Sequence, residues 1–537
     1  MHHRSTLALL ASIALIAPAS AQVGVPTGTL VSTTSTTGDK FGEAVAADGD
    51  VLVVGARAYS QVTTTAGAAT VFERQPDGSW LETATLLPPT PTLLGFFGDT
   101  VAVEGDTIFV AETEDDTFGA DQGAVHVYRR QPDGTWPQVQ VLGPPTPSSL
   151  ASFGSSLSVD SGRLAVGNND GAFTEPYAAV IFAEQQDGTW ALEAEILAPP
   201  SLENQFGSSV ALAGDWLVVG ATDWTSGQSA RAFVFRRQGG GIWPLHSILQ
   251  PNDMSVLQHF GTSVAALEVN GDLLVAVSAT NNGDGAVDLF EALGAGGWNH
   301  LQRIVAPTPD NTTFGYALEL EAQRLFVSDP NWGLGVSGYG RVWVYERTAA
   351  AQWEPSTVLD HGKGEPREVR LFGWDLAKAG STLFVGEPGF GGPSSSEVGE
   401  VRVFESDTLF QSSNSISVGA GGSVDLLLAA GVGEAGNFHL VLGSVSGTAP
   451  GLPLGPGLVL PLVPDVYTDM TLAGGGGVLT GGFGQLDSLG AGGASFGLPA
   501  ASDPALVGVV AHHAVVTLDA TPQLTSVSGA SQLELVP

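Results

Sequence analysis

Cysteine is absent from the 537-residue sequence, which excludes disulfide bonds, thiolate metal sites, thiol nucleophiles and lipidated cysteine anchors. Positive charge is also scarce: 19 lysines and arginines face 55 aspartates and glutamates, giving a formal net charge of -36. A surface of this sign repels the phosphate backbone of nucleic acids and the anionic face of a membrane. We therefore expect no nucleic-acid partner.

Apolar runs long enough to cross a membrane are missing beyond the first residues, and we expect no membrane span. Residues 1–21 differ from the rest, because Arg4 precedes a short apolar stretch, 7–17, and small residues at 19–21 resemble a cleavage site. The alternative, a membrane anchor, is disfavoured because a helix this short spans about half of a bilayer core. We predict a signal peptide over residues 1–21 and a secreted or cell-surface location for the mature chain.

Apolar residues (43%) and glycine (72 residues) are plentiful, whereas charged residues make up only 14% of the chain. This balance supplies a core and excludes bulk disorder. Because the glycines follow no period of three, they indicate many tight turns and therefore many short strands.

The strongest pattern is a repeated Phe-Gly pair. Neighbouring copies are 53 to 58 residues apart, a period that marks a repeat architecture. Each pair opens an alternating segment, followed by a small turn and a short Val-rich run that suits a buried strand. The phenylalanines of the seven pairs are Phe41, Phe97, Phe153, Phe206, Phe260, Phe314 and Phe372.

Each repeat continues with a third apolar segment, a turn such as 76–78 (Pro-Asp-Gly), and a fourth segment that opens with tryptophan in six repeats. Because these tryptophans recur at one place, packing explains them better than stacking on a sugar. Four strands in each of seven repeats predict a seven-bladed β-propeller. The repeated tryptophans are Trp80, Trp136, Trp190, Trp243, Trp298 and Trp353.

The seventh repeat lacks its fourth segment, since Gln411 stands where tryptophan is expected. A spare strand-like segment, 28–33, precedes the first repeat, and we predict that it closes the ring as the outer strand of the last blade. The predicted fold is therefore all-β, with a propeller over residues 22–405. From residue 406 the repeat stops, Lys and Arg are absent, and short apolar segments between turns predict a C-terminal β-sandwich over 406–537.

The Phe-Gly openings, Gly55-Ala56 after a second strand and Gly123-Ala124 at the start of a third resemble FG-GAP repeats. Repeats of that family build the propeller of integrin α chains and occur in many secreted bacterial proteins. The resemblance implies the fold, and it implies adhesion, scaffolding or, in a few relatives, catalysis. It also implies calcium loops between strands one and two, but turns such as 48–50 have no room for six oxygen ligands.

Two segments between strands two and three are candidate metal sites. Asn282, Asp284 and Asp288 follow the spacing of a calcium loop, the alternative being an Asn-Gly-rich loop. In the second repeat the corresponding loop gathers carboxylates, which hard cations prefer, the alternative being a solvated acidic loop. Calcium is the one cofactor that these patterns suggest. The clustered acids are Glu112, Glu114, Asp115, Asp116 and Asp121.

Two tryptophans, Trp224 and Trp332, fall outside the repeated pattern, in loops after strand two with Asp223 and Asp329 nearby. We predict that these four residues contact a ligand. Residues 493–497 match the Gly-x-Ser-x-Gly elbow of hydrolases, but the proline at 499 opposes the helix that an elbow requires. No catalytic motif therefore stands in a supporting context.

These features favour a non-enzymatic, monomeric recognition or adhesion protein whose variable loops bind an extracellular protein or glycan. Two alternatives stay open. One is a glycan-active propeller enzyme with carboxylates near the central channel. The other is a structural component of an envelope or matrix.

Overall fold

The computed structural model describes residues 22–537 with gaps, and the regular secondary structure of those residues is β-sheet apart from short helical turns and one α-helix, α1 (Val466–Leu472). No helix among the described residues is long and apolar enough to cross a membrane. The predicted signal peptide, 1–21, lies outside the described residues. So do residues 25, 27, 76–78, 147–151, 169–177, 200–204, 223–229, 252–258, 270, 281–284, 294–296, 308–312, 332–339, 349–351, 361–370, 381, 390–397, 406–408, 412–414, 430–435, 448–451, 456–457, 461, 474–476, 487–490 and 528–530.

Up to residue 405, consecutive strands pair antiparallel into a series of sheets, numbered first to seventh along the chain. Each sheet corresponds to one Phe-Gly repeat. The strands are β3–β6 (Ala44–Asp48, Val51–Ala56, Ala68–Arg74, Trp80–Leu86), β7–β10 (Phe97–Glu104, Thr107–Glu112, Ala124–Arg129, Gln138–Leu142), β11–β14 (Phe153–Asp160, Arg163–Asn168, Ala178–Glu184, Trp190–Leu197), β15–β18 (Phe206–Ala213, Trp216–Ala221, Arg231–Arg236, Leu245–Leu249), β19–β22 (Phe260–Val269, Asp272–Ala279, Ala286–Leu293, Gly297–Val305), β23–β26 (Leu318–Leu320, Arg324–Asp329, Arg341–Arg347, Trp353–Leu359) and β27–β29 (Leu376–Ala379, Thr382–Glu387, Glu400–Glu405).

The start of the described chain adds one strand to each of two of these sheets. Strand β2 (Gly28–Leu30) pairs antiparallel with β29, placing Gly28 opposite Val403 at the outer edge of the seventh sheet, as the sequence predicts. Strand β1 (Gln22–Gly24) was not expected, and it adds to the sixth sheet by pairing parallel with β26. The N-terminal segment therefore bridges two neighbouring sheets.

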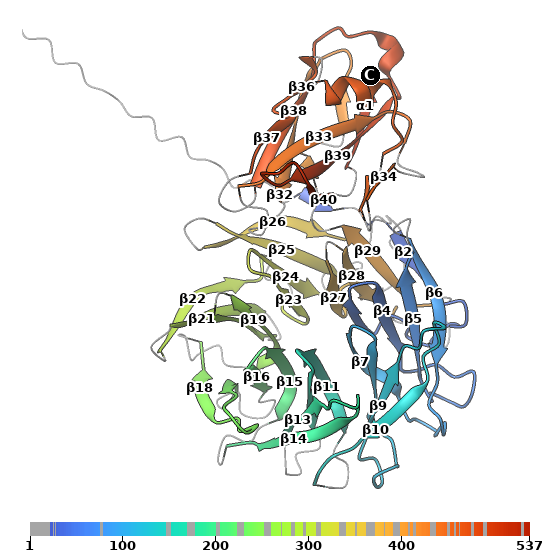
Figure 1. The fold of residues 1–537 in the computed structure, drawn as a ribbon, viewed down its shortest axis with the longest axis vertical. Coiled ribbons are helices and arrows are strands. Elements are labelled where there is room, and N and C mark those ends of the chain that lie inside the picture. Colours follow the sequence, from blue (N-terminus) through green and yellow to red (C-terminus); the bar gives the residue numbers. More distant parts are fainter. Residues whose placement is uncertain are drawn as a thin grey trace, which may run out of the picture.

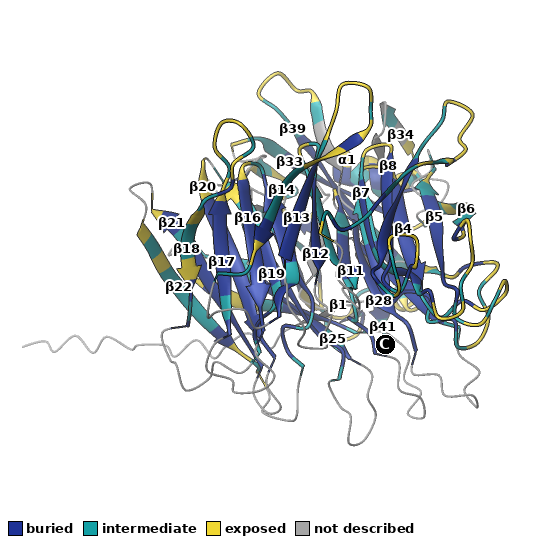
Figure 2. Cartoon of the chain, turned by 90° about the horizontal axis from the view of Figure 1, so that it is seen from below, coloured by how far each residue is buried: buried dark blue, intermediate teal, exposed yellow. Residues whose placement is uncertain are grey.

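The sheets surround a common centre, with their first strands innermost (Figure 1). Each first strand contacts the first strand of the next sheet, in the order β3, β7, β11, β15, β19, β23 and β27, and β27 contacts β3. The contacts thus form a closed cycle. Figure 2 shows buried strands with exposure concentrated in the loops at their ends and along outer strands such as β22.

The phenylalanine of each of the seven repeated Phe-Gly pairs is completely buried. Its side chain packs inside a sheet or between neighbouring sheets, as Phe97 does in a cluster that joins Val53 of the first sheet to Val110 of the second. The repeat is therefore a packing unit, which explains its period.

The repeated tryptophans contact the preceding sheet, which confirms that they are packing residues. Trp136 donates from Nε1 to Glu73 Oε1 across 3.1 Å. Trp190 meets Phe109 edge-on with ring centroids 4.8 Å apart. Trp80 of the first sheet meets Phe384 of the seventh at 4.9 Å, so the same contact is made where the cycle closes.

The C-terminal region forms two main sheets, in the orders β30-β32-β38-β36 and β31-β41-β39-β33-β37, with β40 on β39, plus the hairpin β34–β35. Side chains from both main sheets share one buried cluster, which includes Val424 and Phe496 of the first and Val515 and Leu533 of the second. The strands are β30 (Leu409–Gln411), β31 (Ser415–Ser417), β32 (Gly422–Ala429), β33 (Phe438–Ser444), β34 (Leu452–Gly455), β35 (Leu458–Leu460), β36 (Leu479–Thr480), β37 (Phe483–Gln485), β38 (Ala491–Leu498), β39 (Val510–Leu518), β40 (Leu524–Val527) and β41 (Ser531–Val536).

Candidate functional site

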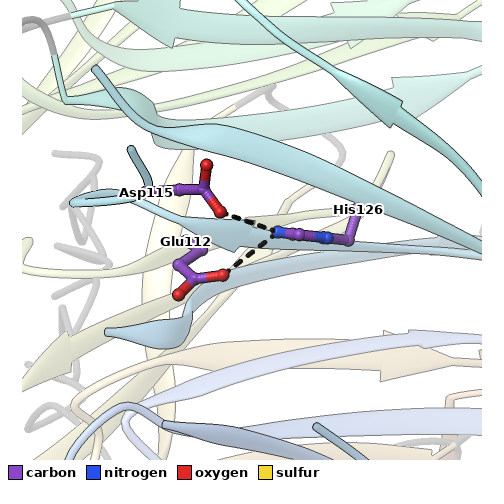
Figure 3. Close-up of side chains that lie close together, drawn as sticks. All are labelled: Glu112, Asp115 and His126. Atoms are coloured by element: carbon purple, nitrogen blue, oxygen red, sulfur yellow. Dashed lines mark ion pairs between the residues drawn. The ribbon is translucent and has the colours of Figure 1, made fainter. Parts of the chain in front are cut away.

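The acidic loop after β8 contains the candidate site, and the structure selects two of its five acids. Glu112 and Asp115 come together with His126 of β9, and one ligand atom of each lies within 4.8 Å of the others. Figure 3 shows both carboxylates directed at the imidazole. We call these three residues the Glu-Asp-His cluster.

Strand register explains why these residues meet. Glu112 at the end of β8 pairs with Ala124 of β9, and His126, two residues further along β9, points to the same side of the sheet. Asp115 returns toward Glu112 through a turn in which its backbone N–H donates to the Glu112 carbonyl across 3.2 Å. The loop then rejoins β9 where the Gly123 N–H donates to the Asp115 carbonyl across 3.1 Å.

The cluster is sealed from solvent, with side-chain exposures of 1% for Glu112, 8% for Asp115 and 3% for His126. His126 Nε2 lies 3.2 Å from Glu112 Oε2 and 3.7 Å from Asp115 Oδ2. Neither His126 nitrogen, nor Glu112 Oε2, makes a hydrogen bond of good geometry. The three groups are close but imperfectly satisfied by one another.

Burial dominates the electrostatics of the cluster. Burial raises the pKa of Glu112, although His126 opposes the shift. Burial alone would lower the pKa of His126, but its attraction to Asp115 and Glu112 raises it overall. For Asp115 burial is outweighed by the nearby His126 imidazole and by the hydrogen bond from Thr117, which together hold its pKa below the usual value. One imidazole is thus shared by two desolvated carboxyl groups.

The other predicted acids of this loop stay apart from the cluster. Glu114 is half-buried, and Asp116 is exposed. Asp116 Oδ1 accepts the Asp121 N–H across 2.9 Å, so these two shape the turn. His126 was missed by sequence reasoning because it stands alone in an apolar strand. The signal that identifies His126 is the strand register, which sets Glu112 opposite Ala124, two residues before His126.

The second predicted metal segment is only partly described. Asn282 and Asp284 lie outside the described residues. Asp288 is fully buried on β21, where Oδ1 lies 2.7 Å from His300 Nε2 and Oδ2 lies 2.8 Å from Arg303 Nη1. Both carboxylate oxygens are already paired with side chains of β22, so Asp288 is placed within its sheet.

Of the four residues predicted to contact a ligand, Asp223, Trp224 and Trp332 lie outside the described residues. Asp329 ends β24 and is only 1% exposed. Its Oδ1 accepts the Thr313 N–H across 3.0 Å, and burial raises its pKa to about 6. Asp329 therefore anchors the segment that leads into the sixth Phe-Gly pair.

A second group of polar residues gathers where the first strands begin. Arg57, just after β4, lies between Glu43 Oε2 at 2.9 Å and Asp99 Oδ1 at 3.1 Å. Glu43 and Asp99 follow the Phe-Gly pairs of the first and second repeats. Burial raises the pKa of Glu43, although Arg57 and Lys40 oppose the shift. This set joins two neighbouring sheets by charge.

The same position in the sixth and seventh repeats is aromatic. Tyr316 and Trp374 lie side by side with ring centroids 4.8 Å apart, and both are partly exposed. Burial raises the pKa of Tyr316, and the charges of Glu43, Asp375 and Asp99 raise it further. Residues from four repeats therefore lie close enough, near the centre, for their charges to affect one another. We call Glu43, Arg57, Asp99, Tyr316 and Trp374 the ring-centre cluster.

Comparison with known proteins supports the repeat and leaves activity open. No curated protein sequence matches the chain. Among solved structures, the Pseudomonas aeruginosa periplasmic gluconolactonase PpgL is similar at 18% identity with a TM-score of 0.37, covering 59% of this chain and 86% of that chain. Residues 27–72 match the FG-GAP repeat family. The chain therefore carries an FG-GAP repeat, within a series of four-stranded antiparallel sheets consistent with a β-propeller.

Proposed function

We propose that this chain is an exported, non-enzymatic recognition protein that binds an extracellular protein or glycan. Its described sheets up to residue 405 form a seven-bladed propeller closed by β2, and residues 406–537 form a β-sandwich. FG-GAP repeats are typical of extracellular proteins, and the predicted signal peptide is in keeping with export.

The division between the two ends of the strands supports a binding scaffold. First and second strands are joined by tight turns such as 49–50, 105–106 and 214–215. Second and third strands are joined by longer and more variable segments, such as 57–67, 113–123 and 280–285. Short turns at one end preserve the fold, while variation at the other can change the ligand without disturbing the core.

The ring-centre cluster is the observation that carries the proposal. It combines a guanidinium, two carboxylates and two partly exposed aromatic rings at the end of the sheets from which the variable segments leave. Aromatic faces and charged hydrogen-bonding groups in one place are the means by which proteins hold sugars and polar protein surfaces. Because Arg57 pairs with both Glu43 and Asp99, the cluster offers charged groups of both signs to a polar ligand.

The proposal is tested by screening the mature chain against immobilised glycans and extracellular proteins, with Trp374→Ala as the site variant. We expect binding of at least one class, weakened by about tenfold or more in Trp374→Ala, as for a buried aromatic anchor. The matched control is Phe483→Ala, which removes a 62% exposed aromatic ring from the C-terminal region and should leave binding unchanged. Equal loss in both variants, or binding that survives in Trp374→Ala, contradicts the assignment.

One observation favours the enzyme alternative. Asp375, beside the ring-centre cluster, has its pKa raised by burial to about 7, the property of a carboxyl that donates a proton near neutral pH. A glycan-active enzyme would turn over a member of the same glycan set, and Asp375→Asn would abolish the products seen by mass spectrometry. Binding without turnover favours the recognition protein.

A further inference from the structure

The Glu-Asp-His cluster holds two carboxyl groups and a single basic group. Among the described residues, Glu112 and Asp115 both form their ion pairs with His126. Two carboxylates therefore share one imidazole in a nearly solvent-free position, and such a surplus is costly in a low-dielectric interior.

The seventh sheet of this chain places a guanidinium at the comparable position. In the seventh sheet, Glu387 pairs in register with Glu400, as Glu112 does with Ala124, and Arg402 stands two residues further on, where His126 stands in the second sheet. Arg402 Nε lies 3.0 Å from Glu387 Oε2, and Arg402 also pairs with Glu400. In the second sheet, an imidazole replaces this permanent charge.

Unpartnered atoms in the cluster point to a role in binding a ligand. Glu112 Oε2 and both His126 nitrogens are buried, yet none makes a hydrogen bond within the described part of the chain. Gln122, in the same loop, also has a buried Oε1 without a hydrogen-bond partner. Buried polar atoms are almost always paired, so the orphaned Glu112 oxygen and His126 nitrogens within one cluster indicate that something else satisfies them.

The donor set and its spacing fit a transition metal. Bonds of about 2.0 to 2.2 Å to imidazole nitrogen and carboxylate oxygen place neighbouring ligand atoms about 3 to 3.5 Å apart around zinc. The 3.2 Å between His126 Nε2 and Glu112 Oε2 lies in this range, and the 3.7 Å to Asp115 Oδ2 is close to it. Calcium fits less well, because it takes six to eight oxygen ligands.

We propose that Glu112, Asp115 and His126 bind one zinc ion that fastens the loop 113–123 to strands β8 and β9. The ion removes the surplus negative charge and pairs the orphaned His126 nitrogen and Glu112 oxygen. Because the site is closed from solvent, its role is structural. The site lies between strands two and three, whereas the calcium loops implied by the FG-GAP resemblance lie between strands one and two.

The test uses the mature chain, purified without a histidine tag, stripped with a chelator and titrated with Zn²⁺ and separately with Co²⁺. We expect one ion per chain by calorimetry, a visible Co²⁺ absorption band of a nitrogen- and oxygen-ligated ion, and a higher unfolding temperature with Zn²⁺. In His126→Gln the affinity should fall by at least about tenfold and the Co²⁺ band should disappear. The matched control is Asp116→Asn, which neutralises an exposed acid of the same loop and should change none of these.

If His126→Gln fails to fold, Asp115→Asn gives the same readout with the imidazole in place, and the wild-type Co²⁺ spectrum stands by itself. Failure of the stripped wild-type chain to bind Zn²⁺ overturns the proposal. So does equal loss of affinity in Asp116→Asn, which would identify an unspecific acidic loop. A thermal shift produced equally by Ca²⁺ and retained in His126→Gln overturns it as well.

Discussion

At the scale of single residues, the Phe-Gly pair requires glycine because neighbouring sheets approach each other closely at this position. Gly98 has φ +86, and a Cβ placed on it would lie 2.3 Å from the Ala68 carbonyl oxygen of the preceding sheet. Both the backbone angle and the space therefore require glycine. Phe97 fills the core beside it, so the pair acts as one unit.

We expect Gly98→Ala to lower the free energy of unfolding by about 2 to 4 kcal/mol, because a positive φ and a backbone clash act together. The matched control is Gly105→Ala, where φ is +54 but nothing lies within 4 Å of the added Cβ. That variant should cost about 1 kcal/mol. Urea unfolding of both variants measures the difference, and equal losses would show that the sheets do not approach this closely.

Residue patterns revealed the repeats but only part of the candidate site. Glu112 and Asp115 were predicted as metal ligands from the density of acids in their loop, and the structure brings them together. His126 was not predicted, because a cluster across two strands becomes visible only when the register of Glu112 against Ala124 is known. Glu114, Asp116 and Asp121 share the loop but not the cluster, since composition does not say which way a side chain points.

At the scale of secondary-structure elements, short polar side chains join one first strand to the next. Thr100 Oγ1 donates to the Gly154 carbonyl across 2.5 Å, and Ser156 Oγ donates to the Gly207 carbonyl across 2.9 Å. At the junction of the seventh and first sheets, Asp375 takes this position, and its Oδ2 accepts the Val45 N–H across 2.9 Å. One buried carboxyl therefore links the two ends of the cycle.

The junction should make stability depend on pH. Burial raises the pKa of Asp375 to about 7 from 3.8, so between about pH 4 and pH 7 the folded chain holds a proton that the unfolded chain has released. The free energy of unfolding should therefore fall as pH rises through this window. Asp375→Asn cannot titrate, and its side chain keeps an oxygen that can accept the Val45 N–H. We therefore expect its free energy of unfolding to exceed that of wild type by about 2 kcal/mol at pH 8, after allowing for solvent screening. At pH 4 this advantage over wild type should be smaller.

Urea unfolding at pH 4, 6 and 8 measures this effect, with Asp106→Asn as the control. The Asp106 side chain is 71% exposed, so its replacement should shift stability equally at each pH. A difference between Asp375→Asn and wild type that does not change with pH would refute the assignment.

The sequence predicted those elements whose residue patterns are strong. The strands of each repeat were predicted because seven copies reinforce one another. Strand β1 was missed because three residues carry no period, and α1 was missed because a seven-residue helix shows little periodicity. Its signal is local: Asp465 accepts the Tyr467 and Thr468 N–H groups, and Thr468 completes a capping box.

At the scale of the whole molecule, the stability of a closed cycle of sheets depends on the junction between its first and last sheets. Here the seventh sheet takes β2 from the start of the chain as its outer strand, while its other strands come from residues 376–405. Trp80 against Phe384 and Asp375 against Val45 join the first sheet to the seventh. Separating the first and seventh sheets would break both of these contacts together.

The central claim, that the N-terminal strand seals the ring, is tested most directly by a designed disulfide in this cysteine-free chain. A Cβ built on Gly28 would lie 3.6 Å from Val403 Cβ, within the range for a disulfide. The double variant Gly28→Cys, Val403→Cys should lose both free thiols under mild oxidation and show, by peptide mapping, a link between β2 and β29. Thiols that both stay free and reactive while the chain remains folded would place β2 away from the seventh sheet and contradict the closed ring.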